Sequence, residues 1–214
     1  NEEKVRLLIN INHELRTPLT LINAPLGRLL KKIDVNNENY TTLLHIYKQS
    51  RWMKYLIDMV LDLRKLEVGK IHLCYRRHSV HQLVREVIEN FSEEFQFQHV
   101  TIKYDCKDEI EEAVFDKEKC MIVLINLVMN ALKHSPVNST VVIQTKCVDG
   151  FIRFSVADQG KGIDEAEKGK LFTRFYQSRG TKGGSGIGLS YAKNLVELHH
   201  GRIGAYNNED KGAT

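Results

Sequence analysis

The sequence contains few of the residues and patterns that mark several protein classes. Its 214 residues include four cysteines, at least fourteen positions apart and without a C-x-x-C pair. This spacing favours reduced thiols over a disulfide framework or a zinc site. Three prolines are too few for a proline-rich disordered chain. The longest nearly apolar run, Met121 to Met129, is far shorter than the roughly 20 residues of a membrane-spanning helix.

The sequence also lacks a strong excess of charge of either sign, since it has 31 Lys and Arg residues and 27 Asp and Glu residues. No run of basic residues alternates with aromatic ones, so the sequence does not predict nucleic-acid binding. No basic and then apolar leader opens the sequence, which begins without methionine. We therefore expect a piece excised or processed from a longer protein.

Apolar residues at helical spacing predict a two-helix hairpin within residues 5–66, joined by the polar stretch 34–39. The first stripe advances in steps of three and four through Leu8, Ile11, Leu15, Leu19, Ile22, Leu26, Leu29 and Ile33. The second runs through Leu43, Ile46, Met53, Ile57 and Val60. Because a hairpin buries each stripe against one helix only, we predict a homodimer in which two hairpins form a four-helix bundle.

The pattern changes near residue 70, where strands and helices mix without regular alternation. We expect strands at 71–75, 101–106, 141–147 and 151–156, and helices at about 79–95, 116–133 and 187–199. Ser79 and Asp116 are placed to cap two of these helices, Asp149-Gly150 predicts a hairpin, and Gly201 predicts the end of the last helix. The mixture favours an α+β sandwich. We expect a hairpin over 1–66, a linker and first strand over 67–78, and a second domain over 79–214.

His13 is the first candidate for chemistry, because a helical wheel places it away from the apolar stripe. Glu14 follows it, Thr17 lies one turn later on the same side, and Pro18 interrupts the helix at a cost of about 3 kcal/mol. A lone exposed histidine usually has no chemical role. A neighbouring carboxylate can, however, orient an imidazole as a nucleophile. The residues leave both interpretations open.

Asn126 and Asn130 lie one turn apart on an otherwise apolar helix, with Lys133 close behind. Such amides cost free energy unless they are paired. They could cap a neighbouring loop, or they could serve a hydrated Mg²⁺ ion that carries phosphates, because Mg²⁺ prefers oxygen ligands. Both alternatives remain open on the residues alone.

Two glycine motifs follow. Asp158, Gly160 and Gly162 form a D-x-G-x-G sequence after a strand, which is either a simple turn or a site where a carboxylate accepts an exocyclic amine. Residues 183–189 then open the final helix with glycines that let backbone N–H groups approach an anion. They match neither a P-loop nor a Rossmann turn. Between the motifs, residues 164–182 have the composition of a flexible lid with three aromatic residues.

Taken together, these segments resemble bacterial sensor histidine kinases. His13-Glu14-Leu15-Arg16-Thr17-Pro18 resembles the H-box, and the later segments resemble the N-box, G1-box, F-box and G2-box in family order, as in the wider Bergerat-type ATPases. The resemblance implies a dimeric helical hairpin followed by an α/β-sandwich ATP-binding domain, and a kinase that uses ATP and Mg²⁺. It implies a receiver domain of a response regulator as partner, in two-component signalling. It also implies the cytoplasmic portion of an inner-membrane-anchored sensor, without direct membrane contact by this fragment. The opening resembles hybrid kinases that carry their own receiver and run a phosphorelay.

The resemblance also assigns roles to residues. His13 would be the phosphoacceptor, Glu14 its activating acid, and Thr17 the polar residue of the reverse reaction. Asn130 would bind Mg²⁺ with help from Asn126. The remaining positions would bind the nucleotide: Lys133 and His134 facing phosphates, Asp158 reading adenine, Gly160 and Gly162 shaping its pocket, Gly184, Gly186 and Gly188 receiving the triphosphate, and Arg174 and Lys182 near the lid.

One departure and two alternative functions remain. The family usually has a further strand after the segment matching Lys211 to Thr214, so we expect the domain to lack its last strand and to have a weakened sheet edge. The lid is also short. A Bergerat-type conformational ATPase without a phosphohistidine is one alternative, although a clamp needs no exposed imidazole. A degenerate scaffold that only dimerises is the other, although the asparagines and glycines argue against it.

Overall fold

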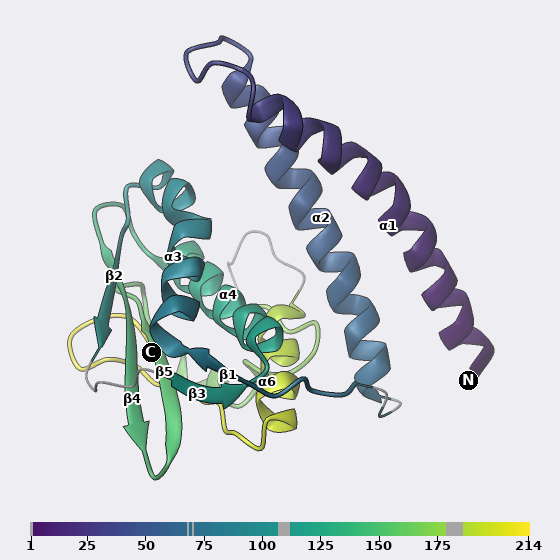
Figure 1. Ribbon diagram of the computed structural model, residues 1–214. Coiled ribbons are helices and arrows are strands. Elements are labelled where there is room, and N and C mark those ends of the chain that lie inside the picture. The colour runs from purple at the N-terminus through teal and green to yellow at the C-terminus, as the bar shows by residue number, and fades with distance from the viewer. Residues whose placement is uncertain (1, 68, 70, 107–111, 179–185) are drawn as a thin grey trace. The chain divides into compact units, whose positions relative to one another are not determined.

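The computed structural model describes residues 2–67, 69, 71–106, 112–178 and 186–214. The chain divides into two compact units, Asn1–His72 and Leu73–Thr214. The first is a helical hairpin and the second packs helices on a β-sheet (Figure 1). Among the described residues, no helix is both long and apolar enough to cross a membrane.

The hairpin pairs α1 (Glu2–Leu30) with α2 (Tyr40–Glu67). The expectation that Pro18 interrupts the first helix was wrong, because α1 continues through Pro18 and Pro25. The turn between the helices is stabilised by asparagine and aspartate side chains. Asp34 accepts a hydrogen bond from the N–H of Asn36 at 2.8 Å, and Asn37 accepts one from the N–H of Asn39 at 2.9 Å. The predicted hairpin and its polar turn are confirmed.

The apolar stripe of α1 divides into two lines. Leu19 is buried on the line that faces α2, where Met59 is buried too. Leu15, Ile22 and Leu29, each seven residues apart, remain 45–46% exposed. An apolar line at heptad spacing is the kind of surface that packs against further helices.

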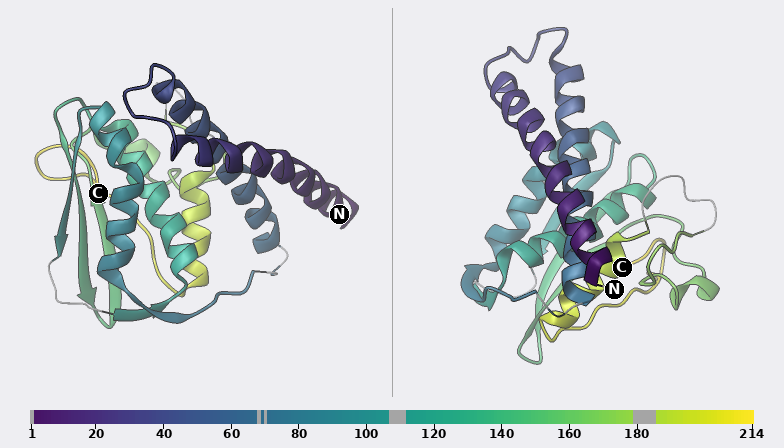
Figure 2. Two further views of the ribbon diagram at one scale, coloured as in Figure 1. Left: turned by 45° about the horizontal axis from the view of Figure 1, so that its top comes forward. Right: turned by 90° about the vertical axis from the view of Figure 1, so that its right-hand side faces the viewer.

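The second unit contains a three-stranded sheet in the order β2–β4–β5, with β2 (Thr101–Cys106) parallel and β5 (Phe151–Ala157) antiparallel to β4 (Thr140–Val148). Helices α3 (Val80–Phe97), α4 (Lys117–His134) and α6 (Gly188–Leu198) cover one face of this sheet (Figures 1 and 2). A separate antiparallel pair joins β1 (Arg76–Ser79) to β3 (Glu112–Phe115), and α5 (Glu165–Lys168) is a single turn. The expected α+β sandwich is confirmed.

The capping and turn signals act as predicted. Ser79 caps α3 by accepting from the N–H of Gln82, and Asp116 caps α4 by accepting from the N–H of Lys119. Asp149 and Gly150 both have positive φ, 52° and 78°, as a two-residue type I′ hairpin requires. The core between helices and sheet consists of aliphatic and aromatic side chains, among them Val80, Leu83, Val84, Val87, Phe95, Leu124, Val128, Val141 and Ile143.

Two further predictions about elements were wrong. Residues 71–75 form no strand, because the N–H of Cys74 donates to the buried carboxylate of Asp116 at 2.8 Å; β1 begins only at Arg76. Gly201 is not the left-handed residue that ends α6. His200 takes that conformation, with φ 60°, and the N–H of Gly201 donates to the carbonyl of Val196, which together make a Schellman-type end.

The chain after α6 forms a small hairpin over residues 206–214. The N–H of each of Tyr206 and Thr214 donates to the carbonyl of the other, at 3.0 and 2.9 Å. The N–H of Asn208 donates to Gly212 at 3.0 Å inside this pair. Among the described strands, β5 pairs with β4 alone, so its second edge has no strand partner there.

Candidate functional site

The second unit contains a cavity of about 940 Å³. Its walls come from the C-terminal half of α4, the strand β5, the segment 161–172 and the segment 202–206. Four of the predicted site residues line it: Asn130, His134, Asp158 and Gly162. The structure therefore brings residues of the asparagine motif of α4 and of the D-x-G-x-G motif to one cavity.

Asp158 is held by a dense set of hydrogen bonds just after β5. Its Oδ1 accepts from the N–H of Gly160 at 2.8 Å and from the N–H of Ala213 at 3.3 Å. Its own N–H donates to the carbonyl of Ala213 at 2.8 Å. Its Oδ2 has no hydrogen-bond partner among the described residues, which leaves one acceptor available on a carboxylate that lines the cavity.

The two glycines of this loop are required by their surroundings. A Cβ atom at Gly160 would lie 2.5 Å from the carbonyl oxygen of His134, which is backbone and cannot rotate away. Gly162 has φ +76°, and a Cβ there would also meet Oδ1 of Asn207 at 2.9 Å. The loop therefore runs directly against the end of α4 and the C-terminal hairpin.

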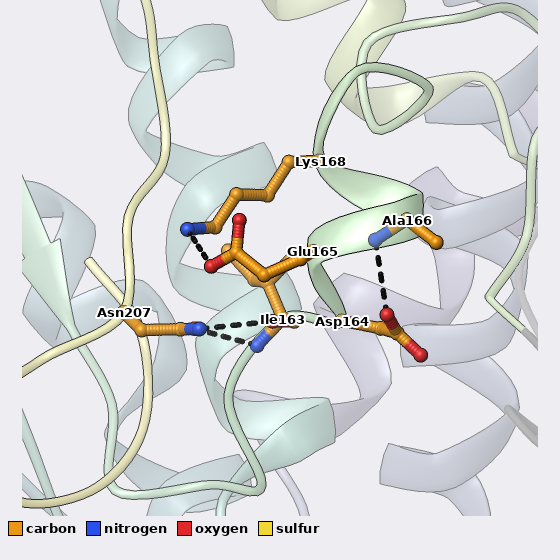
Figure 3. A network of polar contacts seen from close by, with 6 residues as sticks. All are labelled: Ile163, Asp164, Glu165, Ala166, Lys168 and Asn207. Atoms are coloured by element: carbon orange, nitrogen blue, oxygen red, sulfur yellow. Dashed lines mark hydrogen bonds and ion pairs between the residues drawn. The ribbon is translucent and has the colours of Figure 1, made fainter.

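Two asparagines of the C-terminal hairpin bind the backbone of the same loop. The N–H of Ile163 donates to Oδ1 of Asn207 at 2.7 Å, and Nδ2 of Asn207 donates back to the carbonyl of Ile163 at 2.9 Å (Figure 3). Nδ2 of Asn208 donates to the carbonyl of Asp158 at 3.0 Å. Directly after Ile163, Asp164 caps α5 through the N–H of Ala166 (Figure 3).

The two asparagines of α4 have different surroundings. Asn126 is buried, and its Nδ2 donates to the carbonyl of Ile122 at 2.8 Å. A Cβ atom at Gly188 would lie only 2.5 Å from Oδ1 of Asn126, so this side chain packs against the first residue of α6. Asn130, one turn later, is half-buried and lines the cavity, whereas Asn126 does not.

Lys133 and His134 end α4 beside the cavity. Burial lowers the pKa of Lys133 below its usual 10.5. Burial is also the main cause that lowers the pKa of His134 below 6.5, with repulsion from Lys133 adding to it and Asp158 opposing it. The imidazole of His134 is therefore kept neutral near pH 7.

The second glycine motif is described from Gly186 onward. Gly186 has φ +66°, and a Cβ there would lie 2.7–2.9 Å from backbone atoms of Phe175 and Tyr176. The N–H of Phe175 donates to the carbonyl of Gly186 at 2.8 Å, which ties the segment before residue 178 to this loop. Phe175 itself has φ 62°, a conformation that is uncommon for a bulky residue.

Several predicted residues lie away from the cavity or outside the description. Lys182 and Gly184 lie outside the described residues. Arg174 is exposed and does not line the cavity. The backbone of His13 and Glu14 lies in α1, but their side chains are outside the description, while Thr17 is exposed on the same helix.

Sequence reasoning missed the part of the cavity wall that follows α6. Arg202, Tyr206 and Thr214 line the cavity, and Asn207 and Asn208 brace its Asp158 loop. The Asn-Asn pair by itself signals only a turn. The local sequence does not predict contacts with residues more than forty positions earlier.

The cavity has the chemistry of a nucleotide site. Its volume is within the range of roughly 300–1,000 Å³ that small-molecule pockets occupy. It offers an open carboxylate oxygen on Asp158 for an amine, backbone close to its surface at Gly162, and the Asn130 amide for a hard cation or phosphate. The described residues contain no cluster of three or more His, Cys, Asp or Glu side chains suited to a metal ion.

Comparison with known proteins agrees with this chemistry. Residues 115–214 match the family described as histidine kinase-, DNA gyrase B- and HSP90-like ATPase. Residues 3–69 match the His Kinase A phospho-acceptor domain. Histidine kinase P4 of Formosa agariphila is 32% identical over 219 residues, a match that covers 99% of this chain. The chain spans only 16% of the length of that relative.

Two solved structures are similar over most of the chain. Full-length ShkA, crystallised in complex with AMPPNP, gives a TM-score of 0.74 at 25% identity, over 97% of this chain and 44% of ShkA. The histidine kinase ThkA, in complex with the response regulator TrrA, gives a TM-score of 0.62 over 97% of this chain and 59% of that one; at 24% identity this likeness shows the fold alone. With both of its units matched, the chain belongs to the sensor histidine kinases, as their catalytic core.

Proposed function

We propose that this chain is an ATP-dependent protein-histidine kinase whose phosphoacceptor is His13. The observation that carries the proposal is the cavity of the second unit, where Asp158 presents one carboxylate oxygen that accepts no hydrogen bond from a described residue, beside Asn130 and Gly162. An oxygen that only accepts hydrogen bonds suits the exocyclic amine of adenine. The match of residues 3–69 to the phospho-acceptor domain supports a separate acceptor unit.

In the proposed reaction, a nitrogen of the His13 imidazole attacks the γ-phosphorus of ATP. The N–P bond forms as the bond between that phosphorus and the β–γ bridging oxygen breaks, and ADP leaves. Glu14, adjacent in sequence, orients the imidazole and stabilises the charge that develops on it. The phosphoryl group then passes to an aspartate of a receiver domain. Such transfers require mainly positioning and charge neutralisation, so one unit can hold the nucleotide and another the acceptor.

The polar residues around the cavity fit a magnesium nucleotide. The amide oxygen of Asn130 would hold Mg²⁺, which when bound neutralises phosphate charge. Lys133 and the glycine-rich start of α6, including Gly186 and Gly188, would face the phosphates. Asn126 would support the N-terminus of α6, because its side chain packs against Gly188.

Two partners belong to the same proposal. A homodimer through residues 5–66 is supported by the exposed line of Leu15, Ile22 and Leu29. A response-regulator receiver is supported by the solved complex of ThkA with TrrA. As a further part of the proposal, resting on the family resemblance, the chain is the cytoplasmic portion of a membrane-anchored sensor that takes part in a phosphorelay.

A conformational ATPase without a phosphohistidine is not favoured, because its hairpin would need no phospho-acceptor domain. The test is incubation of the chain with γ-labelled ATP and Mg²⁺. We expect a label that is lost in acid and stable in base, and that His13→Gln abolishes. His45→Gln, which replaces an exposed histidine on α2, is the matched control and should keep the label. Label that persists in His13→Gln, or ATP hydrolysis without any label, would overturn the proposal.

A further inference from the structure

We propose that Asn207 is a positioning residue that fixes the base-recognising loop 158–163 from outside the cavity, and so sets both nucleotide affinity and the preference for adenine over guanine. The inference deepens the proposed function and rests on it. Asn207 itself was not a candidate from the sequence, and it does not line the cavity.

The contact of Asn207 with the loop is a two-point clamp. Its side-chain amide accepts from the N–H of Ile163 at 2.7 Å and donates to the carbonyl of the same residue at 2.9 Å (Figure 3). An asparagine amide therefore satisfies both backbone groups of Ile163, as a neighbouring strand would. This pairing fixes the orientation of the peptide planes on either side of Ile163, including the one that joins it to Gly162.

The first half of the loop is braced by Asp158 and by Gln159, whose Oε1 accepts from the N–H of Thr140 at 2.7 Å, but its second half has less support. The loop lies between the end of β5 and the cap of α5, and it contains Gly160 and Gly162, whose backbone is the least restricted of any residue. Its first end is held at Asp158, through Ala213 and Asn208. Its second end is held at Ile163, and the side-chain contact there comes from Asn207.

The clamp is in turn held by the hairpin over 206–214. The paired bonds between Tyr206 and Thr214 close this hairpin, and Oγ1 of Thr214 donates to Oδ1 of Asn208 at 2.6 Å. Two adjacent asparagines of the hairpin over 206–214 therefore hold the two ends of the loop at once. Without Asn207, Asp158 would keep its own contacts, but the Gly162–Ile163 wall of the cavity would lose its fixed position.

Because Asn207 and Asp158 are held by separate contacts, loss of Asn207 should weaken the binding of adenine nucleotides specifically. Adenine presents an amine to the Asp158 carboxylate, whereas guanine presents a carbonyl at the corresponding position, which the carboxylate repels. A fixed wall holds the base at the right position for Asp158, so that the adenine amine is bound and the guanine carbonyl is repelled. A loosened wall weakens adenine binding and relaxes the discrimination, while guanine nucleotides, bound poorly from the start, change little.

The experiment measures the Kd values of ADP and GDP with Mg²⁺ by calorimetry, on the whole chain and on three variants. Asn207→Ala removes both hydrogen bonds, and we expect ADP to bind about tenfold more weakly with GDP affected less than about twofold. Asn207→Asp keeps the acceptor but sets a second acceptor oxygen against the carbonyl of Ile163, and we expect a loss of ADP affinity at least as large as that of Asn207→Ala. Gln144→Ala removes an amide hydrogen bond between β4 and β2, to Asp105, and is the control that should change neither Kd.

Kinetics separates positioning from general damage. We expect Asn207→Ala to raise the KM for ATP in autophosphorylation about tenfold while kcat at saturation stays within about twofold of the parent. Equal ADP affinity in Asn207→Ala and the parent would overturn the inference, as would parallel losses for ADP and GDP. If Asn207→Ala does not fold, the Asn207→Asp variant decides by the same ratio of ADP to GDP affinity. Failure of the unaltered chain to bind ADP would instead overturn the proposed function.

Discussion

At the scale of single residues, Gly150 and Gly212 both have a left-handed backbone conformation but different surroundings. Their φ angles are +78° and +87°. Nothing lies within 4 Å of a Cβ atom at Gly150, whereas a Cβ at Gly212 would lie 2.0 Å from the carbonyl oxygen of Asp158. The pair therefore separates the cost of backbone strain from the cost of a clash.

We expect Gly150→Ala to lower the free energy of unfolding by about 1–2 kcal/mol, which is the cost of the left-handed conformation. Gly212→Ala should lose about 1–3 kcal/mol more, because it displaces the backbone of Asp158. It should also weaken ADP binding, which Gly150→Ala leaves unchanged. Urea unfolding and calorimetry check both statements; equal losses in the two variants would show that Asp158 does not depend on this close approach.

His134 gives a prediction about pH. Its pKa in the folded chain is below 6.5, chiefly through burial, so the folded state takes up the proton less readily than the unfolded chain. The stability that a neutral His134 provides is present above pH 6.5 and is lost as the pH falls from there toward the folded pKa. We therefore expect His134→Gln to lose less free energy of unfolding between pH 7.5 and pH 5.5 than the parent.

The measurement is urea unfolding at the two pH values. His99→Gln, which replaces an exposed histidine of the same unit, is the control and should keep the pH dependence of the parent. An identical pH dependence in parent and His134→Gln would contradict the lowered pKa.

At the scale of elements, two aspartates cap helices under different burial. Asp116 is buried, caps α4 through Lys119 and also accepts from the N–H of Cys74. Asp164 is exposed and caps only the single turn of α5. Asp116 therefore joins the start of the second unit to its central helix, while Asp164 organises a short local turn.

We expect Asp116→Ala to cost about 2–3 kcal/mol, because a cap is lost and the N–H of Cys74 is left without its partner. Asp164→Ala should cost less than about 1 kcal/mol. Thermal and urea unfolding of the two variants give the comparison. A loss for Asp116→Ala no larger than for Asp164→Ala would mean that the contact with Cys74 contributes nothing.

These elements also show how far the sequence alone can go. Ser79, Asp116 and the Asp149-Gly150 turn were predictable because each acts on residues within four positions. The pairing of β1 with β3 was not predictable, because both strands are four residues long and their register depends on contacts between residues 33 to 39 positions apart. The same holds for the candidate site: its motifs are local, but the clamp of Asn207 on Ile163 joins residues 44 positions apart.

At the scale of the whole molecule, the exposed line of α1 predicts self-association. Ile22 lies on this line, and its neighbour Leu21 is 70% exposed but lies off the heptad spacing. We expect Ile22→Lys to convert dimers to monomers, because a charge in the seam of a four-helix bundle is costly to bury. Leu21→Lys should leave the dimer intact. Sedimentation at several concentrations measures both, and a monomeric parent chain would contradict the prediction.

The hairpin over 206–214 also has a consequence for synthesis on the ribosome. Asn208 binds the carbonyl of Asp158, a residue made fifty positions earlier. A nascent chain therefore cannot complete this loop until the later segment has left the exit tunnel. Until then the cavity has an unfinished wall, so we expect nucleotide to bind only after residues 206–214 have emerged.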